Sequence, residues 1–220
     1  MHVVIAGGHG KIALLTERLL ADRGDTVAGF IRNPDHAADL EAAGAQPVVL
    51  DLENAAVDEV AAHLRGADAV IFAAGAGPGS GAARKQTVDR DAAILLADAA
   101  EAAGVPRYLM ISAMGADAQV PDDAADEVFV AYLRAKGAAD ADVRSRSSLS
   151  TTIVRPGALT DDPGSGRVQI AEHTGRGSIP RADVAAVLVA AIDAPQTGGH
   201  TFEVIAGDTP VAEAVAALTR

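Results

Sequence analysis

Three side chains of this sequence have the types and the order needed for proton transfer to a carbonyl oxygen. Tyr132 and Lys136 stand four residues apart in the segment AYLRAK, and this spacing places both on one face of a helix. An ammonium group near a phenol lowers the pKa of the phenol from its usual value of about 10. A tyrosine tuned in this way can give a proton to an oxygen, or take it in the reverse direction. Ser112 ends the apolar run RYLMIS and can hydrogen-bond the same oxygen.

A glycine-rich turn follows the first apolar run of the chain. The run HVVIA leads into GGHGKIA, where Gly7, Gly10 and Ala13 give the pattern GxxGxxA. Between a strand and a helix, the first glycine permits a tight turn, the second lets the backbone approach a pyrophosphate, and the small third residue allows close helix packing. The helix N-terminus then points free N–H groups at the phosphates. We expect a dinucleotide to bind at Gly7, Gly8, His9, Gly10, Lys11 and Ile12.

Two residues of this turn have a second interpretation. Lys11 would add a positive charge beside the phosphates, and His9 would contact phosphate or ribose through its backbone. Each is interpreted equally well as a solvated surface residue. Lys136, in the segment AYLRAK, can also reach the cofactor ribose.

The end of the second apolar run distinguishes NAD from NADP. An acidic residue there would hydrogen-bond the ribose 2′-hydroxyl and repel a 2′-phosphate. The run TVAGFI is followed instead by Arg32 and Asn33, and a guanidinium can form two hydrogen bonds with a phosphate. We therefore expect NADP(H), with NAD as the alternative. The competing interpretation of Arg32 is an ordinary surface arginine.

Residues after the third and fourth runs would complete the cofactor crevice. Asp51 and Leu52 follow QPVVL, at a point that faces the adenine when strands are parallel. Asp51 would accept a hydrogen bond from the adenine amino group, or else cap a helix over 55–65. The small residues at the end of the fourth run, Ala73, Ala74 and Gly75, leave room for a cofactor across the strand ends.

The elements that must position these residues alternate along the chain. Continuous apolar runs of four to eight residues are typical of strands covered on both faces. Their strict alternation with helical patterns predicts a Rossmann-type, doubly wound α/β fold with a mostly parallel sheet and helices on both faces. The predicted strands cover 2–6, 26–31, 46–50, 69–74, 107–112, 151–155 and 201–206. The predicted helices cover 11–23, 35–43, 55–65, 84–103, 123–141, 181–193 and 210–219.

The length of 220 residues fits one domain, so residues 1–220 are expected to form a single dinucleotide-binding domain. The segment 157–181 is less regular, with a strand expected near 167–171. We interpret it as a small elaboration on the substrate side, beyond the sixth strand.

Composition excludes several classes of function. A net charge of −12 repels phosphate backbones, so no nucleic-acid partner is expected. The sequence has no run of about 18 apolar residues and no basic leader, which argues against a membrane span and a signal peptide. It has no cysteine, which fits a cytoplasmic protein. Its six histidines lack metal-ligand spacing, so no metal is expected. We expect a small-molecule substrate as partner and leave the oligomeric state open.

These segments together resemble the atypical short-chain dehydrogenase/reductase superfamily, in its NmrA-like, NAD-dependent epimerase/dehydratase-like group. The resemblance covers essentially the whole chain. It implies a Rossmann fold, a bound nicotinamide dinucleotide, and Ser112, Tyr132 and Lys136 as the catalytic residues. It also implies that Pro156 and Gly157 lie beside the nicotinamide. The segments on which the resemblance rests are VVIAGGHGKIA, FIRNP, DL at 51–52, FAAGAG, YLMISAMGA, AYLRAKGAAD and TTIVRPGALTDDPGSGRV.

The expected function is therefore that of an NADP(H)-dependent oxidoreductase, with hydride transfer to or from a small carbonyl or quinone-like substrate. A nucleotide-sugar epimerase or dehydratase is one alternative, although only about forty residues after Arg181 leave little room for a sugar-binding domain. A non-catalytic NAD(P)-sensing regulator of the NmrA-like kind is another. Tyr132 and Lys136 argue against a sensor, which does not need them.

Overall fold

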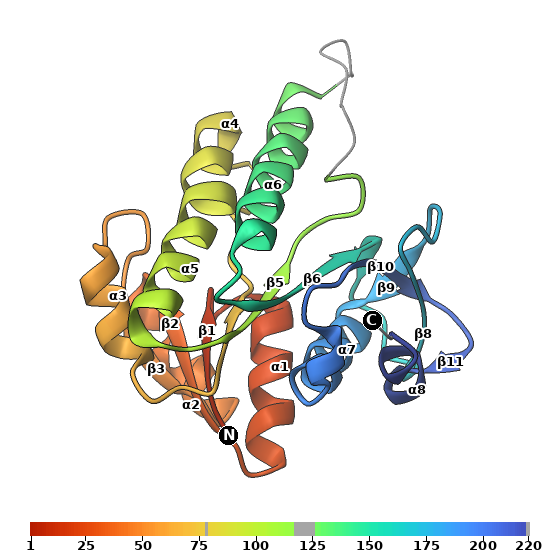
Figure 1. Cartoon of the computed structure of the whole chain (residues 1–220), viewed down its shortest axis with the longest axis horizontal. Helices are drawn as coiled ribbons and strands as arrows, with labels where there is room; N and C mark the ends of the chain where they lie inside the picture. The colour runs from red at the N-terminus through yellow and green to blue at the C-terminus, as the bar shows by residue number, and fades with distance from the viewer. Residues whose placement is uncertain (78, 117–125, 219–220) are drawn as a thin grey trace.

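The computed structural model describes residues 1–77, 79–116 and 126–218, which form a large twisted sheet between two layers of helices (Figure 1). Most neighbouring strands are parallel, and only β8 runs antiparallel to its neighbours. The predicted fold class is confirmed. In spatial order the strands are β11 (Thr209–Pro210), β8 (Arg167–Ala171), β10 (Thr201–Ala206), β6 (Ser150–Pro156), β5 (Arg107–Ile111), β4 (Ala69–Phe72), β1 (His2–Ala6), β2 (Thr26–Ile31) and β3 (Gln46–Val49).

The position of β1 in the middle of the sheet explains why its sequence is continuously apolar. It lies between β2 and β4, with Val3 opposite Val27 on one side and Ala69 on the other. Successive side chains of a strand point to opposite faces of the sheet. Val3 accordingly packs in the core on one face and Val4 in the core on the other, and both are fully buried.

Two layers of helices cover these two cores. One face carries α1 (Lys11–Asp22), α2 (Ala37–Ala42), α7 (Arg181–Ile192) and α8 (Val211–Ala216). The other carries α3 (Val57–Leu64), α5 (Ala92–Ala103) and α6 (Glu127–Ser145). Because parallel strands all end at one edge, the turns after β1, β2, β4 and β5 meet there. Among the described residues, no helix is both long enough and apolar enough to span a bilayer.

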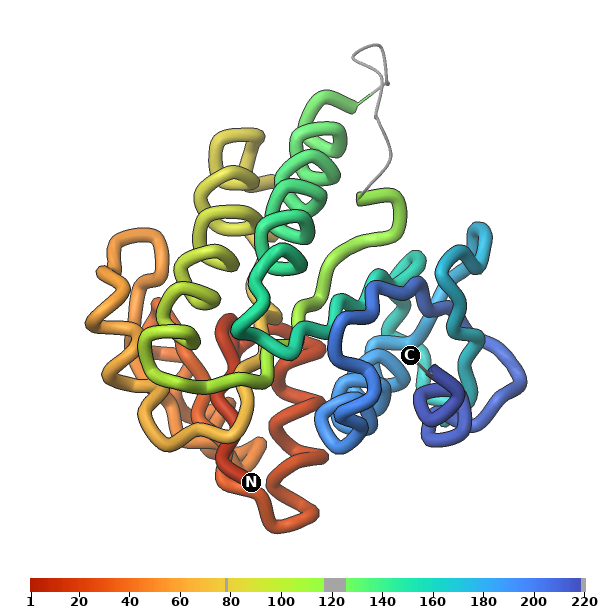
Figure 2. Tube along the Cα trace, viewed as in Figure 1, coloured from red at the N-terminus to blue at the C-terminus, as the bar shows by residue number. Residues whose placement is uncertain are grey.

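The helix predicted over 84–103 is built from three pieces. It begins as α4 (Gly81–Arg84), continues as a π-helix over Lys85–Asp91 and ends as α5. Figure 2 shows these pieces as one continuous coil, and the π-helical part packs side by side with α6. A π-helix is rare and occurs most often at functional sites. Here it turns Lys85 and Asp89 into the interior.

Other boundaries also differ from the prediction. The first residues of the helix expected over 123–141 fall at 123–125, outside the described residues. The segment 157–181 contains the expected strand β8 and two short strands that were not predicted, β7 (Ala158–Thr160) and β9 (Ser178–Pro180). These two pair in parallel as a separate small sheet. Strand β11 was not predicted either.

Candidate functional site

The glycine turn after β1 packs directly on the segment that follows β4. Gly7 has a φ of +82°, and a Cβ atom added to it would lie 2.6 Å from the Cα of Ala74. Only glycine satisfies both the left-handed conformation and the close contact. Gly10 precedes α1, and its N–H donates to the Gly7 carbonyl at 2.9 Å. No side chain of the described chain caps the start of α1, so its first N–H groups stay open toward an anion.

His9 and Lys11, the two residues of this turn that have a second interpretation, both contact other side chains. The His9 ring stacks on His36 with 3.6 Å between the ring centroids, and its Nε2 lies 2.8 Å from Asp39 Oδ2. Lys11 Nζ donates to Asp161 Oδ2 at 2.5 Å, although the two residues are 150 positions apart. Asp161 also accepts from Arg181 at 2.7 Å. The glycine turn is thereby tied to the segment predicted as the substrate-side elaboration.

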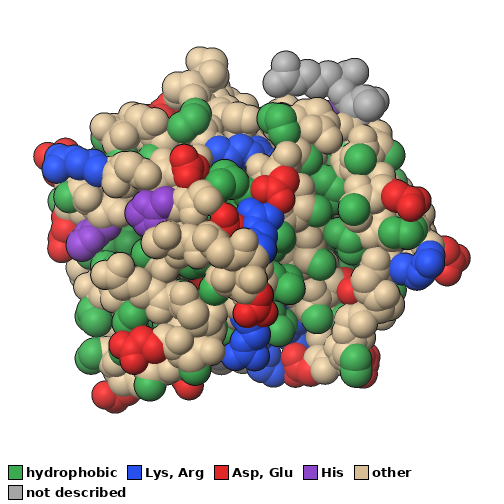
Figure 3. Space-filling model, turned by 90° about the horizontal axis from the view of Figure 1, so that it is seen from below, with side chains coloured by type: hydrophobic (Ala, Val, Ile, Leu, Met, Phe, Trp, Pro, Cys, Tyr) green, Lys and Arg blue, Asp and Glu red, His purple; other side chains and the backbone are tan. Residues whose placement is uncertain are grey.

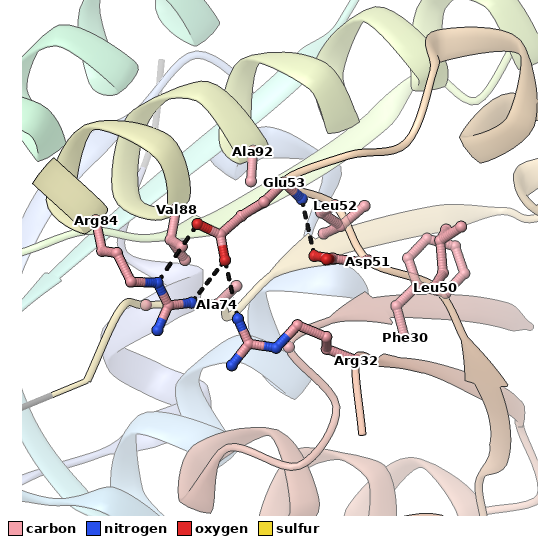
Figure 4. A pocket seen from close by; sticks show the side chains of 12 residues that line it. Phe30, Arg32, Leu50, Asp51, Leu52, Glu53, Ala74, Arg84, Val88 and Ala92 are labelled. Carbon is pink, nitrogen blue, oxygen red and sulfur yellow. Dashed lines mark hydrogen bonds and ion pairs between the residues drawn. The ribbon is translucent and has the colours of Figure 1, made fainter. Parts of the chain in front are cut away.

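Two adjoining cavities lie beside this turn. One has a volume of about 270 Å³, and the other has about 160 Å³ (Figure 4). They share Gly7, Phe30, Arg32, Ala74 and Gly75. The larger cavity is also lined by His9, Gly10, Asn33 and Ala73, and the smaller one by Asp51 and Leu52. The structure therefore brings most of the cofactor residues predicted at the first four strand ends to one place. Gly8, Lys11 and Ile12 line neither cavity, and Gly8 and Ile12 are buried.

Arg32 forms an ion pair with Glu53, an acidic residue that the sequence analysis did not identify. Its Nη1 donates to Glu53 Oε2 at 2.9 Å, and Arg84 Nη2 donates to the same oxygen at 2.6 Å (Figure 4). Thr87 Oγ1 donates to Glu53 Oε1 at 2.7 Å. The hydrogen bond and charge of Arg84 lower the pKa of Glu53 below its ordinary value. Asn33 has a local role, since its Oδ1 accepts from the N–H of Asp35 at 3.1 Å.

Asp51 does not cap the helix over 55–65. That helix, α3, has Ala56 as its N-terminal flanking residue, with no side-chain cap among the described residues. The Asp51 carboxylate instead accepts from the Glu53 N–H at 3.1 Å and from Asn54 Nδ2 at 2.8 Å. It orders the turn that carries Glu53.

Charge is distributed unevenly over the surface. Figure 3 shows a face on which Lys and Arg side chains gather across the middle, with acidic groups beside them, although the chain carries a net charge of −12. A local group of cations can hold a phosphate even when the protein as a whole is acidic.

Ser112 and Tyr132 meet at a third cavity, of about 770 Å³. Pro156 and Gly157, at the end of β6, line it as well. Lys136 does not. The other lining residues are mostly apolar, with two arginines among them: Ala113, Met114, Gly115, Phe129, Leu133, Ala158, Leu159, Arg176, Gly177 and Arg181.

Ser112 is held from behind by a buried ion pair. Its Oγ donates to Asp140 Oδ2 at 2.8 Å, and the same oxygen accepts from Arg155 Nε at 2.9 Å and Nη2 at 2.6 Å. Burial raises the pKa of Asp140, while the Ser112 hydrogen bond and the Arg155 charge act in the opposite direction. Because Asp140 and Arg155 stand on α6 and β6, this contact fixes the end of β5 to two other elements.

Lys136 is also buried, with 3% of its surface exposed. Its Nζ donates to the Ile111 carbonyl at 3.0 Å and lies 3.5 Å from Asp89 Oδ1. Burial lowers the pKa of Lys136, and the charge of Asp89 raises it. Lys136 therefore supports the last residue of β5, immediately before Ser112.

The expectation that Lys136 lowers the pKa of Tyr132 is wrong. Burial raises the pKa of Tyr132, and the negative charges of Asp89 and Asp140 raise it further. Lys85 lies over the ring, with its Nζ 5.3 Å from the ring centroid, and it donates to the Gly77 carbonyl. Burial of the ring, with two carboxylates acting in the same direction, thus sets the direction of the shift.

Known proteins resemble this chain over almost its full length. The family model described as NAD(P)H-binding matches residues 7–195. A Bacillus subtilis (strain 168) protein named as the uncharacterized sugar epimerase YhfK is 37% identical over 99% of this chain and 100% of its own. A Bacillus halodurans structure, provisionally named an NAD-dependent epimerase/dehydratase, is 36% identical with a TM-score of 0.88 and covers 98% of both chains.

A further solved structure is named as a reductase. The anaerobillin reductase ChuY from Escherichia coli O157:H7 is 26% identical, has a TM-score of 0.79, and covers 94% of this chain and 98% of its own. The resemblance to the atypical short-chain dehydrogenases/reductases is confirmed by these matches together with the glycine turn. The chain belongs to the NAD(P)H-binding family.

Proposed function

We propose that this chain is an NADP(H)-dependent oxidoreductase that transfers hydride to or from a small carbonyl or quinone-like substrate. One observation carries the proposal. The hydroxyl-bearing residues Ser112 and Tyr132 share a cavity with Pro156 and Gly157, and β5 and β6 end at the same sheet edge as β1 and its glycine turn. The family match supports a nicotinamide cofactor at this edge.

The residues of the first two cavities fit a dinucleotide. The Gly7–Ala74 contact leaves a backbone surface that any Cβ would fill, and the uncapped start of α1 offers N–H donors to a pyrophosphate. Leu52 and Ala74 would flank the adenine, and Arg32 would hold a 2′-phosphate. When bound against Pro156 and Gly157, the nicotinamide supplies or accepts the hydride.

Tyr132 is the proposed proton donor. Because burial raises its pKa, the phenol keeps its proton at neutral and moderately alkaline pH and can give it to the substrate oxygen. The same shift makes a phenolate base scarce, so reduction should be faster than alcohol oxidation near neutral pH. Ser112 assists after its hydroxyl turns away from Asp140, whose charge stays balanced by Arg155.

Lys136 acts in this proposal by supporting β5 and, once the cofactor is bound, by contacting its ribose. The substrate would lie in the third cavity, where Phe129, Leu133 and Leu159 present apolar surface. Such a lining favours a flat, apolar acceptor over a free sugar.

The test is NADPH oxidation against quinones, aldehydes and flavins, followed by the loss of reduced-nicotinamide absorbance. We expect at least one of these acceptors to be reduced and Tyr132→Phe to reduce the rate by roughly 10²–10⁴-fold. Tyr108→Phe is the matched control, because Tyr108 is the other of the two tyrosines. Its hydroxyl donates to the Ala93 carbonyl in the core. NADPH binding without reduction of any acceptor would favour a sensor, and turnover of a nucleotide sugar would favour an epimerase.

A further inference from the structure

The Glu53 carboxylate bridges two arginines at the rim of the smaller cofactor cavity. Its Oε2 is shared by Arg32 at 2.9 Å and Arg84 at 2.6 Å, and Arg84 Nε lies 3.4 Å from Oε1. Figure 4 shows both guanidinium groups directed at this one carboxylate. The three residues come from the end of β2, the turn after β3 and the end of α4, so only the folded chain brings them together.

Two guanidinium groups directed at one oxygen form a site for an anion with more charge than a carboxylate carries. A phosphate monoester has about −1.5 to −2 charges and three acceptor oxygens, and arginine pairs with it through two parallel hydrogen bonds. Among the described residues, Glu53 is the one carboxylate that hydrogen-bonds to both cations and supplies a single charge, while Asp51 and Asp89 act on Arg84 through their charge alone. The charge and hydrogen bond of Arg84 lower the pKa of Glu53, so the carboxylate is ionised and competes with any other anion for this position.

The position matches one part of the proposed cofactor. Arg32 lines both cofactor cavities, while Glu53 and Arg84 line only the smaller one, together with Asp51 and Leu52. A ribose that joins an adenine in the smaller cavity to a pyrophosphate in the larger one would therefore present its 2′ position between Arg32 and Arg84.

We propose that Arg32 and Arg84 form a two-arginine clamp for the 2′-phosphate of NADP(H), and that Glu53 is the resident anion which this phosphate displaces. With NAD(H), no phosphate arrives, and Glu53 stays in place and accepts a hydrogen bond from the ribose 2′-hydroxyl. The chain then binds both cofactors and prefers the phosphorylated one. This inference rests on the cofactor site of the proposed function and is independent of the hydride-transfer step.

Arg84 is the decisive residue for the test, because Arg32 follows β2, where a phosphate-binding arginine is already expected. Calorimetric titration with 2′,5′-ADP and with 5′-ADP isolates the 2′-phosphate without any need for a substrate. We expect the unmodified protein to bind 2′,5′-ADP more tightly. Arg84→Ala should weaken 2′,5′-ADP by about 10-fold or more and 5′-ADP by less than about 2-fold, which corresponds to the loss of one charge-assisted pair. Arg84→Lys should keep part of the preference.

Glu53→Gln tests the displacement. Loss of the competing charge should tighten 2′,5′-ADP several-fold, by roughly 3- to 10-fold, and should weaken NADH. Arg90→Ala is the matched control, since Arg90 lies on the adjoining π-helix and pairs with Asp91. Its thermal midpoint and nucleotide affinities should match those of the unmodified protein.

The remaining outcomes separate this inference from the proposed function. Equal weakening of both nucleotides by Arg84→Ala would place Arg84 at the shared adenosine part and overturn the clamp. Weaker binding of 2′,5′-ADP by Glu53→Gln would make Glu53 a support of the clamp and overturn the displacement. Equal affinity of the unmodified protein for the two nucleotides would overturn the clamp and leave the dinucleotide site standing. If neither nucleotide binds, the proposed cofactor site itself is wrong.

Discussion

Glu17 provides a prediction that needs no substrate. This residue of α1 is fully buried, and both of its carboxylate oxygens lack a hydrogen-bond partner in the part of the chain that the structure describes. A Cβ atom on Gly29 would lie 2.7 Å from Glu17 Oε1, and one on Gly8 would lie 3.0 Å from it. The carboxyl group is therefore pressed against the backbone beneath the glycine turn. Burial raises the pKa of Glu17 from 4.5 to about 8.

The direction of the pH effect follows from this raised pKa. Below about pH 4.5 the group is protonated in both the folded and the unfolded chain, and stability is complete. As the pH rises toward 8, the unfolded chain releases the proton while the folded chain retains it, so the free energy of unfolding falls. A pKa difference of one corresponds to about 1.4 kcal/mol, which gives a loss of roughly 3–5 kcal/mol across this window.

Urea unfolding at several pH values between about 5 and 8 measures this loss. Glu17→Gln keeps the shape and removes the titration, so the difference in unfolding free energy between it and the parent should change with pH by most of that amount. The absolute stability of the variant is less informative, because a buried amide also needs hydrogen-bond partners. Glu59→Gln, on the exposed surface of α3, is the control. Parallel pH curves for Glu17→Gln and the parent protein would refute the reasoning.

Three further outcomes follow from the site. Because burial keeps Tyr132 protonated, the rate of substrate reduction should stay nearly constant from about pH 6 to about pH 9; a steep fall near neutral pH would assign the proton to another group. Gly7→Ala forces a side chain into a φ of +82°, and should cost about 2 kcal/mol or more in urea unfolding and abolish NADPH binding in a fluorescence titration. Lys136→Met leaves the Asp89 carboxylate unpaired in the interior; we expect a loss of roughly 3–5 kcal/mol with weaker cofactor binding and slower turnover, and unchanged thermal stability would contradict it.

The fold was predictable because its strands are buried on both faces. Runs such as HVVIA and TVAGFI carry no polar alternation, and β1 and β2 occupy the predicted residues. The missed strands β7, β9 and β11 have two or three residues each, too few to form a pattern. The π-helix at Lys85–Asp91 was missed because its sequence has an ordinary helical composition.

The site residues that follow strand ends were predictable from the sequence. The effect of burial on the pKa values of site residues was not. Ser112 and Tyr132 share a cavity as their order suggested; their catalytic roles stay predictions. The error over the Tyr132 pKa arose because the largest cause is burial of the ring, which exists only in the folded chain. The charges of Asp89, from the π-helix, and of Asp140, further along α6, raise the pKa in the same direction. Glu53 carried a weak signal, since it lies two residues after Asp51, at a strand end already assigned to the cofactor.

The order of the lining residues along the chain has a consequence for how related proteins can diverge. Every residue that lines the two cofactor cavities lies between Gly7 and Ala92, and every residue that lines the third cavity lies between Ser112 and Arg181. Changes confined to the second half of the gene can therefore reshape the substrate cavity while the two cavities beside the glycine turn are inherited intact. The proposed nicotinamide contacts at Pro156 and Gly157 change together with the substrate cavity that they line. The ion pairs Lys11–Asp161 and Lys136–Asp89 are among the contacts at which the two halves must stay compatible.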